Sequence, residues 1–308
     1  TTPTMRKLAA LLLISVLALS HAFEHKCTHD QHDHQEPEII DVEEDFNPDG
    51  DNDHNSNGRT LASYSNFRPY FYTGLLSSSS SSVRNYVQNQ LIPPIMDYFA
   101  GALKAKYPIT GSLKVSTSTI CGKSTPSVLK NGLNADWFFM VETNSASDYI
   151  AQTTTCALSS GTKRPIVGKT IISTRYLTPT TNPLDHERQM ICIMHEVVHA
   201  LGFSKGLYDN WLTSSGKVLT GHITKATLDG VSTSVINAEP LTSRLRKHFG
   251  CSSLKGAYME NTGSSGTAGS HFERRQFAYE AMTSGLITQM QVSEMTLAVL
   301  ESTGWWVS

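Results

Sequence analysis

The sequence predicts an α+β fold, with a mixed sheet and helices packed on it. Short segments rich in β-branched and aromatic residues, separated by Gly, Ser, Asn and Pro, predict strands at 68–72, 113–116, 137–141 and 166–172. Two longer segments, 83–103 and 185–202, repeat apolar residues at the spacing of one helix face. The 308 residues are enough for one large domain or two small ones with a buried core.

The two helical segments carry their own boundary signals. Pro93-Pro94 interrupts the first segment, and because proline lacks the backbone N–H we expect a kink or a restart there. The second segment has Asp185 as a suitable N-cap and Gly202 as a residue that can close a helix in the left-handed conformation. The expected core face of this second helix consists of Met190, Met194, Val197, Val198 and Leu201.

The N-terminal segment 1–22 has the pattern of a secretory signal peptide. Arg6-Lys7 precedes the apolar run 8–19, and Ser20-His21-Ala22 follows with small residues at the positions that a signal peptidase reads. The apolar run is shorter than the roughly 20 residues of a membrane-spanning helix. The residues before Met5 are an upstream remnant with no assigned role. We therefore expect a protein that is secreted or held at the cell surface.

Residues 23–60 differ in composition from the rest of the chain. They are rich in His, Asp, Glu and Asn and poor in apolar residues, so they cannot bury enough surface to offset the loss of chain entropy. We interpret them as a propeptide outside the fold, although weak metal binding by their histidines is an alternative. The catalytic domain then covers residues 61–308. Basic and acidic residues nearly balance, 25 against 27, so the net charge argues neither for nor against a nucleic-acid partner, and none is expected.

The segment His195-Glu196-Val197-Val198-His199 lies inside the second predicted helix. Two histidines four residues apart are one helical turn apart and can bind the same metal ion, while Glu196 lies roughly 100° around the helix. Zinc lowers the pKa of its bound water to about 7, and a neighbouring carboxylate can accept the proton. The motif predicts one catalytic Zn²⁺ per chain, with Glu196 as general base.

A catalytic zinc needs a third protein ligand, which the local sequence does not supply. A histidine ten residues after the first is absent, because that position is Lys205. The third ligand must come from farther along the chain. The candidates are His222, His248, His271 and Glu239.

The run from His195 to Ser204 (His-Glu-Val-Val-His-Ala-Leu-Gly-Phe-Ser) resembles the active-site helix of the leishmanolysin family of metallopeptidases. In that family a third zinc histidine follows a Gly-Ser pair and a buried turn methionine comes later. The chain matches these features at Gly269-Ser270-His271 and at Met282. The resemblance, which extends over about Phe67 to Trp306, implies a metzincin-like fold: a twisted mixed sheet, an active-site helix and a mostly helical C-terminal subdomain. It selects His271 as the third ligand.

The resemblance also gives roles to the five cysteines. His25-Lys26-Cys27-Thr28-His29-Asp30 resembles the propeptide motif whose thiolate occupies the open zinc position of the latent enzyme. Family members resemble the chain in having a cysteine pair at the places of Cys121 and Cys156, which implies a disulfide. Cys192 and Cys251 pair with each other, or Cys251 pairs with a cysteine of the C-terminal region that relatives have and this chain lacks.

These features together predict a secreted or surface zinc metalloendopeptidase, made as a zymogen, that hydrolyses protein or peptide substrates. Any membrane association would depend on a region outside this chain. A module of the same fold that has lost catalysis and serves cell adhesion is an alternative. The intact Glu196 argues against it, because a protein without catalytic activity does not need this carboxylate. A structural zinc site is disfavoured because such sites usually have four protein ligands and are rich in cysteine.

Overall fold

The computed structural model of the chain describes residues 36–45, 64–228, 230–262, 268–285 and 289–308. The predicted signal peptide, most of the predicted propeptide and Cys27 lie outside the described residues.

The centre of the fold is a five-stranded mixed sheet in the order β1-β8-β9-β7-β3. Strand β3 runs parallel to β7 and β7 parallel to β9, whereas β8 is antiparallel to β9 and β1 is parallel to β8. The prediction of a mixed sheet is confirmed, as are the predicted strands at β3, β7 and β9. The strands are β1 Glu38–Ile40, β3 Pro69–Tyr72, β7 Trp137–Asn144, β8 Ala151–Ser159 and β9 Pro165–Ser173.

Two details of the sheet differ from the prediction. Residues 113–116 form no strand; Leu113 makes only an isolated bridge to Leu133, and its apolar side chain belongs to a core cluster on a loop. Strand β8 was not predicted, because its run of threonines lacks the apolar alternation that marks a strand. Strand β8 forms because it pairs with β9 along most of its length, although its local sequence has no strong strand pattern.

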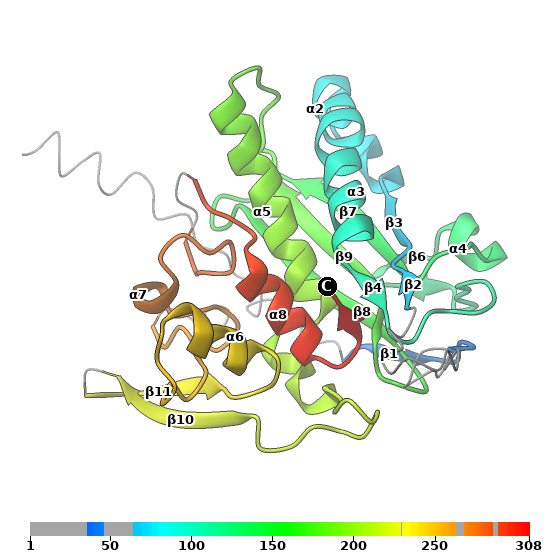
Figure 1. The fold of residues 1–308 in the computed structure, drawn as a ribbon. Helices are drawn as coiled ribbons and strands as arrows, with labels where there is room; N and C mark the ends of the chain where they lie inside the picture. The colour runs from blue at the N-terminus through cyan, green and yellow to red at the C-terminus, as the bar shows by residue number, and fades with distance from the viewer. Residues whose placement is uncertain (1–35, 46–63, 229, 263–267, 286–288) are drawn as a thin grey trace, which may run out of the picture.

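Helices cover one face of this sheet (Figure 1). The first predicted helical segment is helix α2, Ser81–Tyr86, a π-helical stretch, Val87–Leu91, and helix α3, Ile92–Ala102. The irregularity expected at Pro93-Pro94 is present: the prolines occupy the first turn of α3, directly after the wider π turn. The opposite face carries a smaller apolar cluster that includes Leu129 of helix α4, Ser127–Asn131.

Helix α5, Pro183–Leu201, lies beside α3 on the same face. Its N-cap is Asn182, whose side-chain oxygen accepts a hydrogen bond from Leu184 N at 3.0 Å, and not Asp185, which lies in the first turn. Gly202 ends the helix as expected, with φ of 143°. A Cβ at this position would lie 2.8 Å from Thr303 Cγ2, so both the backbone conformation and the packing require glycine.

The half of the chain after α5 is mixed in structure, not mostly helical as expected. A hairpin of β10, Ile223–Leu228, and β11, Val231–Ile236, pairs with β12, Ala257–Tyr258. Only short helices follow: α6 Leu241–His248, α7 Arg274–Phe277 and α8 Glu294–Ser302. This half contains many Gly, Ser and Thr residues, which favour turns and strands over helix. The smaller elements are β2 Ser65–Asn66, η1 Gly74–Ser78, β4 Lys104–Ala105, β5 Thr119–Ile120, β6 Lys123–Ser124, η3 Lys205–Asn210 and β13 Trp306–Val307.

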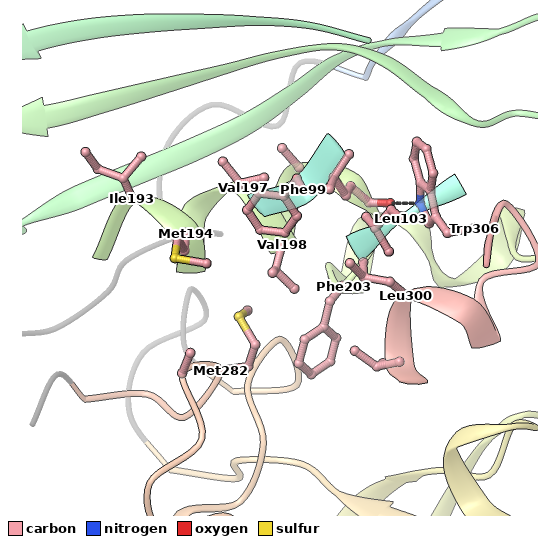
Figure 2. Close-up of a cluster of buried hydrophobic side chains, with 14 of the residues drawn as sticks. Phe99, Leu103, Ile193, Met194, Val197, Val198, Phe203, Met282, Leu300 and Trp306 are labelled. Atoms are coloured by element: carbon pink, nitrogen blue, oxygen red, sulfur yellow. Dashed lines mark hydrogen bonds between the residues drawn. The ribbon is translucent and has the colours of Figure 1, made fainter. Parts of the chain in front are cut away.

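One large apolar core joins the two halves around α5 (Figure 2). Val197 and Val198 of α5 lie in its centre, with Phe99 of α3 on one side and Met282 from the second half on the other. Trp306 lies at one end, and its Nε1 donates a hydrogen bond to Leu201 O at 2.9 Å. Strand β13, which contains Trp306, pairs with β4, the short strand that follows α3.

Residues 36–45, which belong to the predicted propeptide, pack against the fold. Strand β1 pairs with residues 157–159 of β8, and Thr110 N donates to Glu43 O at 3.0 Å. The Glu44 carboxylate forms an ion pair with Arg164, at 3.3 Å between Oε1 and Nε, and the two side chains are only 6% and 0% exposed. The expectation that all of 23–60 lies outside the fold is therefore wrong for residues 36–45, because backbone pairing, one buried carboxylate and the packing of Ile40 and Val42 against the smaller apolar cluster hold this segment to the fold.

Candidate active site

Helix α5 carries the His195-Glu196-Val197-Val198-His199 motif in its last two turns, deep inside the protein. His195, Glu196 and His199 are 3%, 1% and 0% exposed, so the helix presents three polar side chains to the interior. Val197 and Val198 face the core on either side of them. A buried imidazole or carboxylate is costly unless it is hydrogen-bonded or bound to a metal. The burial of the three side chains therefore requires partners.

The third histidine comes from the loop before α7. His271 is fully buried, and its Nε2 atom lies 3.1 Å from Nε2 of His195 and 3.2 Å from Nε2 of His199. The Nε2 atoms of His195 and His199 are 2.9 Å apart. Among the described residues, these three form the one group of His, Cys, Asp or Glu side chains close enough to hold a metal ion.

Hydrogen bonds to carbonyl oxygens fix the tautomers of His195 and His199. Nδ1 of His195 lies 2.6 Å from Ala281 O, and Nδ1 of His199 lies 2.8 Å from Phe203 O. A carbonyl oxygen only accepts, so both Nδ1 atoms carry the proton and both Nε2 atoms present a lone pair. Lone pairs that converge at about 3 Å repel one another unless a cation lies between them. Tetrahedral zinc at about 2.0–2.1 Å from each nitrogen would separate them by about 3.3 Å, so the triad fits such an ion.

A turn around Met282 connects the helix histidines to His271. Ala281 O accepts the His195 proton, and Met282 O accepts a hydrogen bond at 2.8 Å from the N–H of Phe272, the residue after His271. The Met282 side chain is fully buried beneath α5, where Figure 2 shows it close to Val198 and Phe203. The turn therefore positions ligand residues from two distant parts of the chain.

The carboxyl group of Glu280 attaches this turn to helix α8. Its Oε2 atom accepts a hydrogen bond from the Thr296 hydroxyl at 2.6 Å. Burial raises the pKa of Glu280, and the hydrogen bonds from Ser293 and Thr296 partly offset that rise. The turn is thus held by α8 as well as by its own backbone.

A small cavity lies next to the triad. It exposes His195 and Glu196 of α5 on one side, Ile150 and Ala151 at the start of β8 on another, and residues 283–285 after the Met282 turn on a third. Glu196 therefore faces a space of about 10 Å³, enough for about one water molecule. A carboxylate at the rim of such a space, one residue from a metal-ligand candidate, can exchange a proton with water or with a leaving group.

The other candidate ligands lie away from the triad. His222 is buried against Trp211, with ring centroids 5.1 Å apart, and burial lowers its pKa. His248 is exposed at the end of α6. Glu239 is exposed and accepts a hydrogen bond from Ser243 N at 3.2 Å. Of the four candidates, only His271 is brought to His195 and His199.

The cysteines of the catalytic region are placed as follows. Cys121 and Cys156 form a disulfide that attaches the loop before α4 to strand β8. Cys192 and Cys251 do not bond to each other, so that alternative is wrong. Cys192 lies on α5 at the wall of the cavity, and burial, followed by the neighbouring Glu196, raises the pKa of its thiol. Sequence reasoning missed this location, although Cys192 lies three residues before His195 and hence on the same helix face.

Two helix histidines, a third histidine from a distant loop and a glutamate between the first two define the class of metal-dependent peptidases. The sequence profile of the leishmanolysin family matches residues 79–308, about three quarters of the chain. The chain therefore belongs to the leishmanolysin family, a family of zinc metalloendopeptidases, and the expected resemblance is confirmed.

Curated relatives agree with this assignment. The chain is 33% identical over 183 residues to a leishmanolysin-like peptidase of Caenorhabditis elegans, covering 49% of this chain and 27% of that protein. It is 29% identical over 216 residues to a leishmanolysin-like peptidase of Drosophila melanogaster, covering 56% and 30%. It is 28% identical over 225 residues to a leishmanolysin homolog of Crithidia fasciculata, covering 71% and 32%. The chain spans about a third of the length of these relatives.

Proposed function

We propose that the protein is a zinc-dependent metalloendopeptidase that hydrolyses peptide bonds of proteins. The observation that carries this proposal is the triangle of Nε2 atoms of His195, His199 and His271, directly beside Glu196 at the rim of a cavity. One Zn²⁺ held by the three imidazoles would polarise the scissile carbonyl and lower the pKa of water. Glu196 would accept the proton of the attacking water and deliver it to the leaving amine.

The free edge of strand β8 supports an extended peptide as the substrate. Strand β1 pairs only with residues 157–159, so the described part of the chain leaves residues 151–156 unpaired on that edge. Ala151, the first residue of β8, lines the cavity beside Glu196. A peptide that adds a strand to this edge would satisfy its backbone N–H and C=O groups and carry its scissile bond past the triad.

We also propose that residues 23–60 are a propeptide and that the Cys27 thiolate blocks the metal in the zymogen. The direction of β1 supports this, because β1 runs parallel to β8 and its first residue, Glu38, therefore lies at the end of β1 that is nearer to Ala151. Cys27 precedes Glu38 by 11 residues, which can span up to about 36 Å. The distance from Ala157 back to Ala151 is about 20 Å, so Cys27 can reach the triad.

The proposed location is outside the cell or at its surface, and it rests on the signal-peptide pattern of residues 1–22. Across the parts of the chain that the structure describes, no helix combines the length and the apolar character needed to span a membrane.

Zinc content and casein hydrolysis of four purified proteins test the main proposal. Glu196→Ala should keep zinc and lose hydrolysis, because the carboxylate serves as base and not as ligand. His271→Ala should lose zinc, whereas His248→Ala, a change at an exposed histidine, should behave like wild type. Full zinc binding by His271→Ala would reject the ligand set. A zinc-loaded wild type that cleaves nothing would favour the adhesion module over the enzyme.

The zymogen proposal has its own test. Cys27→Ser in the unprocessed chain should raise casein hydrolysis, because serine is a far weaker zinc ligand than a thiolate. Equal latency of the two unprocessed proteins would reject the switch without affecting the peptidase proposal.

A further inference from the structure

A second cavity adjoins the one at Glu196. The two share Ile150 and Cys192 as walls, and the second has a volume of about 220 Å³. That is many times the roughly 10–15 Å³ that one water molecule needs. Arg188 lies eight positions before Glu196 on α5, a distance of about 12 Å along the helix axis. An extended peptide covers this distance in about four residues.

The second cavity is lined by two arginines and by no acidic residue. Arg188 is paired with Asp185 at 3.2 Å, and both side chains are partly exposed, so Asp185 offsets part of its charge. Arg175 donates its Nε proton to Ser145 O at 2.7 Å and has no carboxylate partner among the described residues. Arg175 therefore lines the second cavity without a carboxylate counter-ion among the described residues.

Hydrogen bonds hold the walls of this cavity in place. The Tyr176 hydroxyl donates to Ser147 O at 2.7 Å, which fixes the turn after β9 to the loop before β8. The buried side chain of Gln189 accepts a hydrogen bond from Thr178 N at 2.8 Å, which fixes the same turn to α5. A guanidinium on a fixed turn binds a carboxylate with little further loss of entropy.

We propose that this cavity is a substrate subsite for an acidic side chain, Glu or Asp, within about four residues of the scissile bond, and that Arg175 is its main specificity-determining residue. The guanidinium is always charged and offers two parallel N–H donors that match a carboxylate. Arg188 adds to the positive potential of the subsite. This inference rests on the proposed peptidase function and adds a substrate class to it.

Internally quenched peptides test the subsite. A neutral peptide that the enzyme cleaves is varied at each of the four positions on either side of the scissile bond, with Glu, Gln or Lys at that position. At one position, the Glu peptide should have a kcat/KM about three- to tenfold above that of the Gln peptide, because Arg175 is exposed and its ion pair is partly screened by water. This ratio should fall towards one in 1 M NaCl.

Two substitutions of Arg175 separate charge from packing. Arg175→Gln should bring the Glu-to-Gln ratio close to one, and Arg175→Glu should make the Lys peptide the better substrate. Lys247→Gln, at an exposed cation on α6 without an ion pair in the described structure, removes the same charge and should keep the wild-type ratio. Fluorescence anisotropy of the same peptides with the Glu196→Ala variant measures their binding without turnover. The affinities for the Glu and Gln peptides can then be compared directly.

The outcomes separate this inference from the function on which it rests. Casein hydrolysis with a Glu-to-Gln ratio of one at every position, or with a ratio that Arg175→Gln does not change, overturns the acidic subsite and leaves the peptidase intact. A wild type that hydrolyses neither casein nor any of the peptides overturns the peptidase function and the subsite with it.

Discussion

Replacement of Glu44 by alanine should destabilise the whole catalytic domain, although Glu44 lies in the predicted propeptide. Its carboxylate accepts hydrogen bonds from the Thr162 backbone N–H at 3.2 Å and from the Thr162 hydroxyl at 2.9 Å, in addition to the ion pair with Arg164. In Glu44→Ala these donors lose their acceptor, and the fully buried guanidinium loses its counter-ion.

The magnitude follows from what remains around Arg164. Removal of one partner of a buried ion pair typically costs about 3–5 kcal/mol. Arg164 keeps a hydrogen bond from Nη1 to Asp136 O at 2.8 Å and a contact with the ring of Trp306 at 5.4 Å, and water can enter where the segment loosens. We therefore expect the lower end, about 3 kcal/mol. Glu44→Gln, which keeps the acceptor oxygen, should cost less.

Urea unfolding followed by tryptophan fluorescence measures the effect. With an m value of about 3 kcal/mol/M, a loss of about 3 kcal/mol lowers the midpoint by about 1 M. Asp41→Ala is the control, because Asp41 is exposed and, among the described residues, its carboxylate accepts a hydrogen bond only from the Ser160 hydroxyl, at 2.8 Å. The urea midpoint of this variant should therefore remain close to wild type. A loss below about 1 kcal/mol in Glu44→Ala would refute the reasoning, since Arg164 would then not depend on this segment.

The remaining predictions concern stability. Cys121→Ser together with Cys156→Ser opens a loop with a sequence separation of 35 and should lower the free energy of unfolding by about 4 kcal/mol; a melting temperature unchanged from wild type would contradict this. The pKa of His222 is lowered by burial, so the unfolded state binds its proton more readily and stability should fall as the pH drops below about 6.5. His222→Phe should reduce the loss of urea midpoint between pH 7.5 and pH 5.5, and an identical loss would reject the role of His222. Gly202→Ala should cost about 2 kcal/mol or more, because φ is 143° and the new Cβ meets Thr303 and Trp305; circular dichroism melting near the wild-type temperature would count against it.

The parts of the fold that the sequence predicts are those with a strong local pattern. Strand β7 begins with a continuous run of apolar residues rich in aromatic side chains, and helix α5 repeats apolar residues with a period of 3.6, so both patterns are visible without any tertiary information. Strand β8 and the hairpin β10-β11 are rich in threonine and serine and become strands through pairing with their neighbours. These strands form because they pair with strands elsewhere in the chain, so no local pattern in the sequence predicts them.

The residues of the candidate site also fall into those that a local pattern predicts and those that only the folded structure brings together. His195, Glu196 and His199 share a helix, and their spacing is sufficient to group them. His271 lies 72 residues after His199, and the residues alone left it as one of four candidates. Only the resemblance to leishmanolysins singled it out, and the structure then brings it to the helix through the turn at Met282. The cavity walls at Ile150 and Cys192 come from different elements and follow only from the packed structure.

The pairing of β1 with β8 makes the state of this segment depend on protein concentration once the chain is cut. While β1 belongs to the same chain as β8, the covalent link keeps the two strands at a high effective concentration, typically of the order of millimolar for linked partners. A cut anywhere in residues 46–63 would convert this contact into an association between two molecules, which dilution weakens. The extent to which the severed segment stays in place, and with it the access of other chains to the edge of β8, would then depend on protein concentration. If the proposed propeptide is cut there, release of the β1 segment would go further at low protein concentration than at high.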